Sequence, residues 1–362
     1  MTPFDEPDRR HMARALQLAS KALNSAHPNP RVGCVFVRDG RTVAEGWHER
    51  AGGPHAEAMA LANAAGSVAG ATVYVTLEPC NHHGRTPPCS EALIDAGVSR
   101  VVYAIGDPNP LVNGRGAQRL REAGVQVQSG LLAAEATELN AGFIKRMQRG
   151  VPLVRLKMAM SLDGRTALSD GRSQWLTSEV ARADVQAWRA RSSAVLTGIG
   201  TVLADDPRLS VRPVAAGVQQ PLRVILDRQL RTPPAARVFE GAAQGGVWIF
   251  TDSGDGKRMA ALQARGARIE RGAASLAQVL TRLGNDGVNE VLVEAGATLA
   301  GAFLQQRCVD ELLLYVAPMV LGDRARGLLQ LPEPPSLAQA QRFEMIEAVA
   351  VGVDQRLRLR VE

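Results

Sequence analysis

The chain has 362 residues, 46% of them hydrophobic and 22% charged, which is typical of globular proteins and too long for a single hydrophobic core. No run is long and apolar enough to span a membrane, and charged residues precede any apolar run at the N-terminus, so we expect neither a membrane segment nor a signal peptide. The net charge of +6 favours anionic ligands, but aromatic residues are only 4% and the arginines are scattered, so we expect a small-molecule partner and no nucleic acid.

Helix and strand patterns alternate in the first part of the chain. Apolar residues at helical spacing predict helices at 7–25 and 55–65, and a further helix is expected from Cys89. Apolar, β-branched runs predict strands at 32–37, 43–48, 72–77 and 100–105. Residues 113–150 are expected to hold a glycine-rich loop, a helix, a short strand and a basic connector at 143–150. A new strand begins at Val151, so we expect two domains, 1–150 and 151–362.

The second half also alternates strands and helices. Strands are expected at 151–158, 194–197, 223–227, 247–251 and 290–294, and helices at 179–191 and 297–306. The last of these strands breaks at Ala295-Gly296 into a helix, an arrangement that exposes N–H groups able to hold a phosphate. The pair Gly198-x-Gly200 does not satisfy the dinucleotide-binding spacing and fits plain glycine turns equally well.

Residues 55–89 contain the ligands of a catalytic zinc site. One histidine and two cysteines, His55, Cys80 and Cys89, provide three ligands and leave a fourth position for water. Zinc lowers the pKa of bound water from about 15.7 to roughly 7. Glu57 is placed to take that proton and return it to a leaving amine. His-x-Glu followed by Pro-Cys is the signature of the zinc-dependent nucleobase deaminases.

The spacing of the two cysteines departs from that signature, because residues 81–88 separate Cys80 from Cys89. This insert contains His82, His83 and Arg85, which we expect at the mouth of the site, where an anionic substrate could be met. The alternative is a closed structural site in which His82 or His83 replaces the water. A structural site has no use for Glu57, so the catalytic interpretation is favoured.

Histidine and cysteine are unevenly distributed. All six histidines lie between His11 and His83, so chemistry in the second half must use other groups. The four cysteines form no secreted disulfide pattern, and two of them are explained as zinc ligands, which favours a reducing, cytoplasmic location. In the second half, a loop tryptophan, two arginines near the glycine turn and a carboxylate at a strand end occur together and favour a second site: Trp175, Arg189, Arg212 and Glu294.

Longer motifs occur in both halves. The first half contains His27-Pro-Asn-Pro-Arg-Val-Gly-Cys34, Pro54-His-Ala-Glu57, Thr76-Leu-Glu-Pro-Cys-Asn-His-His-Gly-Arg-Thr-Pro-Pro-Cys89 and Gly106-Asp-Pro-Asn-Pro110. The second half contains Lys157-Met-Ala-Met-Ser-Leu-Asp-Gly-Arg165, Gly200-Thr-Val-Leu-Ala-Asp-Asp-Pro207 and Val293-Glu-Ala-Gly296. With these motifs, in this order over nearly its whole length, the chain resembles the bifunctional deaminase–reductases of riboflavin biosynthesis. The wide cysteine spacing is that family's own pattern.

The resemblance implies an α/β protein with an N-terminal cytidine-deaminase-like αβα domain and a C-terminal dihydrofolate-reductase-like domain. The first domain, with one zinc ion per chain and Glu57 as proton carrier, would hydrolyse the 2-amino group of 2,5-diamino-6-(5-phosphoribosylamino)pyrimidin-4(3H)-one. Its substrate contacts would be Asn29, His48, His82, Arg85, Asp107 and Asn109. The guanidinium of Arg85 is suited to a phosphate.

For the second domain the resemblance implies NADPH-dependent reduction of the ribosyl group to a ribityl chain. Cofactor contacts would be Ala159, Trp175, Thr201, Asp205 and Gly296. Substrate contacts would be Lys157, Ser173, Arg189, Leu209, Arg212 and Glu294, with Lys157 steadying the opened sugar. Arg228 either contacts the 2′-phosphate of the cofactor or is simply solvated, and the sequence leaves both open. The resemblance also implies a homo-oligomer.

Three other functions are compatible with parts of the sequence. The first is a deaminase of another nucleobase or nucleoside with a non-catalytic second half, which leaves the motifs of that half unexplained. The second is a zinc protein that binds nucleic acid, against which the lack of a basic-aromatic cluster counts. The third is a chain in which one domain keeps its fold without activity.

Overall fold

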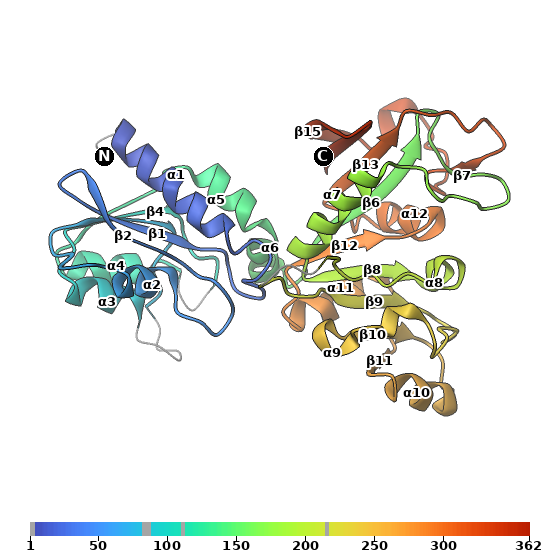
Figure 1. Ribbon diagram of the computed structural model, residues 1–362, viewed down its shortest axis with the longest axis horizontal. Coiled ribbons are helices and arrows are strands. Elements are labelled where there is room, and N and C mark those ends of the chain that lie inside the picture. The colour runs from blue at the N-terminus through green and yellow to red at the C-terminus, as the bar shows by residue number, and fades with distance from the viewer. Residues whose placement is uncertain (1–3, 82–87, 110–112, 214–216) are drawn as a thin grey trace. The chain divides into compact units, whose positions relative to one another are not determined.

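The computed structural model describes residues 4–81, 88–109, 113–213 and 217–362. It divides into two compact units, Met1–Gly150 and Val151–Glu362, each with its own sheet (Figure 1). Among the described helices, none combines the length and the apolar character needed to cross a membrane.

The first unit has one five-stranded sheet. Its strands are β1 (Gly33–Arg38), β2 (Arg41–Trp47), β3 (Thr72–Leu77), β4 (Arg100–Ile105) and β5 (Gln126–Ser129). Its helices are α1 (Glu6–Ser20), α2 (Ala56–Ala62), α3 (Cys89–Asp95), α4 (Arg115–Glu122), α5 (Ala133–Leu139) and α6 (Ala141–Arg149). The strand order is β2-β1-β3-β4-β5, with β1 antiparallel to both neighbours and the last three strands parallel.

Helices cover both faces of this sheet. On one face, Leu18 of α1 and Ala136 of α5 belong to a buried apolar cluster with the strands. On the other, Ala60 of α2, Leu93 of α3 and Leu120 of α4 form a second cluster. The result is the three-layered αβα arrangement that the sequence predicted.

Three sequence-based expectations for this unit were wrong in extent. The helix expected at 7–25 ends at Ser20, and the helix expected at 55–65 spans only Ala56–Ala62. Residues 143–149 belong to α6 and not to a connector. Phe143 is buried, and Arg146 and Arg149 lie in the last turn, where the helix dipole favours positive charge. Gly150 ends the helix in a left-handed conformation (φ 69°). The basic residues that suggested a connector are therefore the end of a helix.

The second unit is larger. Its strands are β6 (Leu153–Ser161), β7 (Arg165–Ala167), β8 (Ala194–Gly198), β9 (Leu222–Leu226), β10 (Val247–Thr251), β11 (Ala267–Arg271), β12 (Glu290–Glu294), β13 (Glu311–Ala317), β14 (Arg326–Gly327), β15 (Phe343–Val351) and β16 (Asp354–Val361). Its helices are α7 (Glu179–Arg191), α8 (Ile199–Asp205), α9 (Ala242–Gly245), α10 (Gly256–Gln263), α11 (Leu276–Asn285) and α12 (Ala297–Gln305), with short 3₁₀ turns at Arg237–Phe239 and Leu337–Gln339.

Nine strands form the main sheet of this unit in the order β11-β10-β9-β8-β12-β6-β13-β16-β15. The strands from β11 to β13 in this order are parallel, β16 is antiparallel to β13, and β15 is antiparallel to β16. Val185 and Trp188 of α7 pack on one face, and Leu283 of α11 and Phe303 of α12 pack on the other. The carboxyl ends of parallel strands share one edge of a sheet. Expected site residues come to that edge from β6, from β12 and from α8, the helix that follows β8.

Candidate active sites

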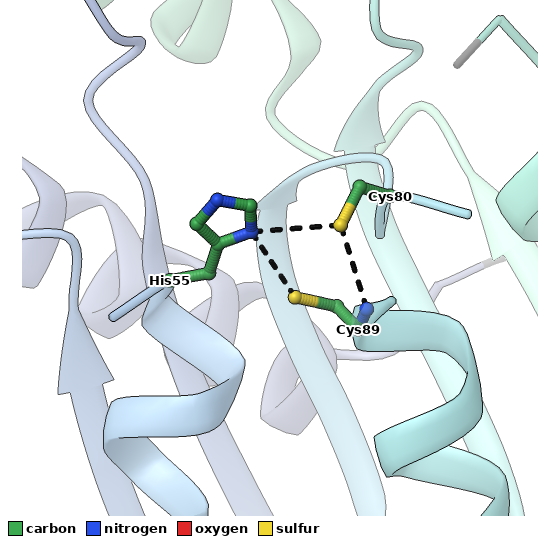
Figure 2. A group of neighbouring side chains, drawn as sticks. All are labelled: His55, Cys80 and Cys89. Atoms are coloured by element: carbon green, nitrogen blue, oxygen red, sulfur yellow. Dashed lines mark hydrogen bonds between the residues drawn. The ribbon is translucent and has the colours of Figure 1, made fainter. Parts of the chain in front are cut away.

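Three side chains of the first unit converge as potential zinc ligands (Figure 2). His55 is the N-cap residue of α2, Cys89 is the first residue of α3, and Cys80 follows the end of β3. The His55 Nδ1 atom lies 3.3 Å from Cys89 Sγ and 3.5 Å from Cys80 Sγ. Tetrahedral zinc, with Zn–N of about 2.0 Å and Zn–S of about 2.3 Å, requires N···S separations of about 3.6 Å. The three side chains therefore fit one zinc ion.

The electrostatics of this cluster favour a thiolate. Hydrogen bonds from the Cys89 side chain and from His55 outweigh burial and lower the pKa of Cys80 to about 4. The backbone N–H of Cys89 also donates to Cys80 Sγ, at 3.4 Å. The hydrogen bond to Cys80 in turn raises the pKa of His55 above its ordinary value. An anionic sulfur beside an imidazole is a donor set that zinc prefers.

Glu57 lies in the first turn of α2, next to the ligand cluster, and only 3% of it is exposed. Burial, reinforced by the negative charge of Cys80, raises the pKa of its carboxyl group to about 7. A carboxyl group with a pKa near neutrality can both accept and return a proton under ordinary conditions.

His48 and Asn29 form a polar pair beside the cluster. The His48 ring is buried, which lowers its pKa, and it meets the His55 ring edge-on at a centroid distance of 5.8 Å. His48 Nδ1 lies 2.8 Å from the Pro54 carbonyl oxygen, which can only accept, so Nδ1 carries the proton. In the neutral ring Nε2 then accepts from the Asn29 amide nitrogen, at 3.0 Å. Both residues were expected as substrate contacts.

The loop that carries Asn29 is fixed by two residues that sequence reasoning missed, Arg31 and Asn140. The Arg31 N–H donates to Asn140 Oδ1 at 2.8 Å, and Asn140 Nδ2 donates to the Arg31 carbonyl at 2.9 Å. The Arg31 guanidinium also donates to the Leu139 carbonyl at 2.8 Å. Arg31 and Asn140 are 3% and 1% exposed, so the contact is internal.

Asp107 and Asn109 follow the end of β4 and form a turn. Asp107 is buried, and its Oδ1 accepts from the Asn109 N–H at 2.8 Å. Glu78, a third residue that sequence reasoning missed, is buried beside this turn and adjoins Pro79-Cys80. A charged residue directly after a buried strand is the sequence signal that could have identified Glu78. His82 and Arg85, expected at the mouth of the site, lie outside the described residues, and so does His83, the other alternative fourth ligand.

In the second unit, Lys157, Arg189 and Glu294 form a charged cluster. Glu294, the last residue of β12, is in register with Lys157 of β6. Arg189 of α7 donates to both carboxylate oxygens of Glu294, with Nη2 2.9 Å from Oε2. Burial opposes ionisation of Glu294, yet Arg189 holds the pKa of its carboxyl group below the usual value. Burial lowers the pKa of Lys157, and Glu294 opposes that effect.

Leu209 and Arg212 lie next to this cluster. Arg189 Nη1 donates to the Ser210 carbonyl at 3.1 Å, and the Arg212 N–H donates to Gln186 of α7 at 3.0 Å. Leu209 is buried with a φ of 53°, a left-handed conformation that costs a leucine about 1–2 kcal/mol. Burial, and then the nearby positive charges of Arg189 and Arg208, lower the pKa of Arg212.

The expected cofactor residues lie on several elements. Ala159 is on β6, Thr201 and Asp205 are on α8, and Gly296 is the N-cap residue of α12. Ser173 and Trp175 lie in the exposed segment before α7, where the Trp175 ring packs on the Arg182 guanidinium at 4.4 Å. Arg228 is exposed and donates to Asp252 at 2.9 Å.

Comparisons with known proteins cover both units. Residues 5–105 match the cytidine and deoxycytidylate deaminase zinc-binding region, and residues 152–354 match the RibD C-terminal domain. The riboflavin biosynthesis protein RibD of Escherichia coli K12 is 48% identical, over 97% of this chain and 99% of its own. RibD of Acinetobacter baumannii (form 1) superposes with a TM-score of 0.92 at 45% identity, covering 99% of each chain. A structure from Thermotoga maritima, described as a diaminohydroxyphosphoribosylaminopyrimidine deaminase/5-amino-6-(5-phosphoribosylamino)uracil reductase, superposes with a TM-score of 0.88 at 34% identity, covering 98% of this chain and 99% of its own.

A His/Cys/Cys zinc-type site on an αβα unit, followed by a reductase domain, defines a bifunctional pyrimidine deaminase and reductase. The expected cytidine-deaminase-like and dihydrofolate-reductase-like folds are confirmed. The chain belongs to the family of the riboflavin biosynthesis protein RibD, as the sequence motifs indicated.

Proposed function

We propose that the first unit deaminates 2,5-diamino-6-(5-phosphoribosylamino)pyrimidin-4(3H)-one and that the second unit reduces the ribosyl group of the product with NADPH. The final product is 5-amino-6-(5-phosphoribitylamino)uracil. The observation that carries the proposal is the convergence of His55, Cys80 and Cys89 beside the buried carboxyl group of Glu57. The Thermotoga maritima relative bears the name of the same two reactions.

In the deaminase step, His55, Cys80 and Cys89 hold zinc, which lowers the pKa of water toward neutrality when bound. Glu57 moves the protons. Its buried carboxylate accepts the two protons of the attacking water in turn, and it delivers one to the ring nitrogen and the other to the departing amine. Ammonia leaves, and a carbonyl replaces the 2-amino group.

Substrate orientation is assigned to the polar groups around the cluster. His48 accepts from the Asn29 amide nitrogen, which leaves the amide oxygen of Asn29 as an acceptor for the pyrimidine. Asp107 and Asn109 form the second contact, and His82 and Arg85 would meet the phosphoribosyl end. A guanidinium forms bidentate, charge-assisted bonds to phosphate.

The residues of the second unit fit NADPH. A Cβ atom on Gly296 would meet no atom within 4 Å, so the space at the start of α12 is open, and its N–H groups suit a phosphate of the dinucleotide. Gly200 in α8 is equally open, next to Thr201. NADPH supplies the hydride when bound. Ala159, Trp175, Thr201 and Asp205 complete the proposed cofactor contacts.

On the substrate side of the second unit, Lys157 steadies the opened sugar. Its ammonium group lies near Glu294, whose carboxylate is fixed by Arg189. Arg212 and the backbone around Leu209 bind the phosphate end of the substrate. Ser173 contacts the substrate from the exposed segment before α7. We also expect a cytoplasmic homo-oligomer that binds small molecules and no nucleic acid.

The test is a paired assay of the purified protein with the diaminopyrimidine ribotide and NADPH, following ammonia release and NADPH oxidation together. We expect ammonia first, and NADPH oxidation that depends on it. Ammonia release without NADPH oxidation would support the alternative of a zinc deaminase with a non-catalytic second domain. If neither signal appears, the substrate assignment is wrong.

A further inference from the structure

Glu78 forms a connection that the proposed chemistry does not use. It lies between the end of β3 and Pro79-Cys80, and it is only 4% exposed. Its partners lie far along the chain: Oε2 accepts from the Gly114 N–H at 3.0 Å and, over a longer 3.4 Å, from the Asp107 N–H, while Oε1 accepts from the Ala117 N–H at 3.2 Å.

Two of these donors belong to the start of α4. Gly114 is its N-cap residue, with a φ of 84° and no side chain that could cap the helix. Unpaired N–H groups at a helix start need acceptors, and a negative charge there is favoured by the helix dipole. Glu78, directly after the end of β3, supplies both the acceptor oxygens and the negative charge.

The start of α4 also touches the segment that carries the zinc ligand. A Cβ atom on Gly116 would lie 1.7 Å from the Pro79 carbonyl oxygen, so the helix backbone packs directly on the peptide before Cys80. The same carboxylate reaches the Asp107 N–H, in the turn expected to contact the pyrimidine. One side chain therefore joins the Cys80 segment, the Asp107–Asn109 turn and α4.

We propose that Glu78 is a positioning residue that holds the Asp107–Asn109 turn in register with the zinc ligand Cys80, so that the pyrimidine is presented to the metal in the reactive orientation. This inference rests on the proposed role of Asp107 and Asn109 in substrate binding. Glu78 itself touches neither the substrate nor the metal.

The test compares Glu78→Gln with a matched control, Glu91→Gln. The glutamine has one acceptor oxygen and faces N–H donors with an NH₂ group, so at least one of the three bonds is lost. Glu91 of α3 also links to α4, through Arg119 Nε at 2.7 Å, but its side chain is 34% exposed. Both variants are full-length, and the reductase rate with the deaminated product serves as an internal control.

For Glu78→Gln we expect the deaminase KM to rise about tenfold with a smaller change in kcat, the loss expected for charge-assisted hydrogen bonds. Zinc content stays at one per chain, and amide hydrogen exchange accelerates at residues 106–109 and 113–118. Glu91→Gln leaves all three readouts unchanged. If Glu78→Gln does not fold, Glu78→Asp, which keeps the charge on a shorter side chain, is expected to change KM and exchange in the same direction.

Two results would overturn the inference. One is an unchanged KM together with unchanged amide exchange at residues 106–109 and 113–118. The other is loss of zinc and of kcat at unchanged KM, which would place the effect on the metal. Should the wild-type protein release no ammonia from the ribotide, the proposed function fails, and the exchange data still decide whether Glu78 holds the turn.

Discussion

Glu57 owes its proton affinity to burial more than to any single partner. Its pKa of about 7 rests first on removal from solvent and then on the negative Cys80 sulfur. Glutamine has the same shape and cannot carry a proton to or from the reacting atoms. The two functions proposed for this region, holding zinc and moving a proton, should therefore be separable by one substitution.

We expect Glu57→Gln to retain one zinc per chain and to lose ammonia release by about 10²- to 10⁴-fold, the usual contribution of a general acid–base. NADPH oxidation with the deaminated product should be unchanged. Metal analysis together with the two rate assays checks this. Loss of zinc in the variant would show that Glu57 supports the metal instead.

The zinc ligands and Glu57 could be predicted from the sequence because their chemistry is contained in short motifs. Glu78 and Asn140 could not, because their partners are distant: Asn140 pairs with Arg31 across 109 positions, and Glu78 with Ala117 across 39. Both side chains bind backbone groups. Almost every residue type carries such groups, so the sequence does not indicate which residue is the partner.

Elements with a strong local pattern were predicted well. The strands β3, β10 and β12 and the helix α7 begin and end where the sequence indicated. The hairpin β15–β16 was not anticipated, although Leu357, Leu359 and Val361 alternate with arginines along β16. No residue of β15 is fully buried, so its own pattern is weak. Its position is set by pairing with β13, which is a tertiary contact.

At the scale of helices and strands, the link between the start of α6 and the Asn29 loop gives a prediction. Asn140→Ala leaves the buried N–H and C=O of Arg31 unpaired, at a cost of about 1–3 kcal/mol each. We expect a higher deaminase KM and an unchanged reductase rate. Asn63→Ala, which removes an exposed amide bonded to the Glu45 carbonyl at 3.0 Å, is the control. Equal effects of the two substitutions would contradict a specific role for Asn140.

Four strands of the second unit share a buried ionic network centred on Glu311 of β13. Its Oε2 accepts from Arg155 Nε of β6 at 2.7 Å, and its Oε1 from Arg358 Nη2 of β16 at 2.7 Å. Arg155 also pairs with Glu290 of β12. Burial opposes ionisation of Glu311, but Arg155 and Arg358 together have the larger effect and lower the pKa of its carboxyl group to about 2.

This lowered pKa predicts acid sensitivity. Because the folded-state pKa lies below the ordinary value of 4.5, the charge of Glu311 contributes stability above that pH and loses it as the pH falls toward about 2. The contribution is about 3 kcal/mol. We expect Glu311→Gln to lower stability at pH 7 and to flatten its decline in acid, measured by denaturant unfolding followed by tryptophan fluorescence. Glu347→Gln, at a half-exposed partner of Arg356, is the control, and an unflattened decline in Glu311→Gln would refute the assignment.

At the scale of the whole molecule, the two units have separate cores and separate site residues. We therefore expect the fragments 1–150 and 151–362 to carry deaminase and reductase activity independently. The deaminase fragment must extend beyond residue 140, because Asn140 fixes the Asn29 loop. Circular dichroism verifies folding before each assay. If both fragments fold and neither is active, the assignment of one activity to each unit is wrong.

The position of β6 has a consequence for how the chain is made. This strand opens the second unit yet lies in the middle of its sheet, paired with β12 and β13. The ribosome therefore releases β6 long before Glu290–Glu294 and Glu311–Ala317 exist to cover its edges. Non-local parallel pairing of this kind folds slowly, and an unpaired apolar strand is prone to aggregation. The first unit can complete its sheet during synthesis, whereas the second unit must wait for nearly the entire polypeptide, which makes the interval before β13 emerges the period in which a chaperone would matter most.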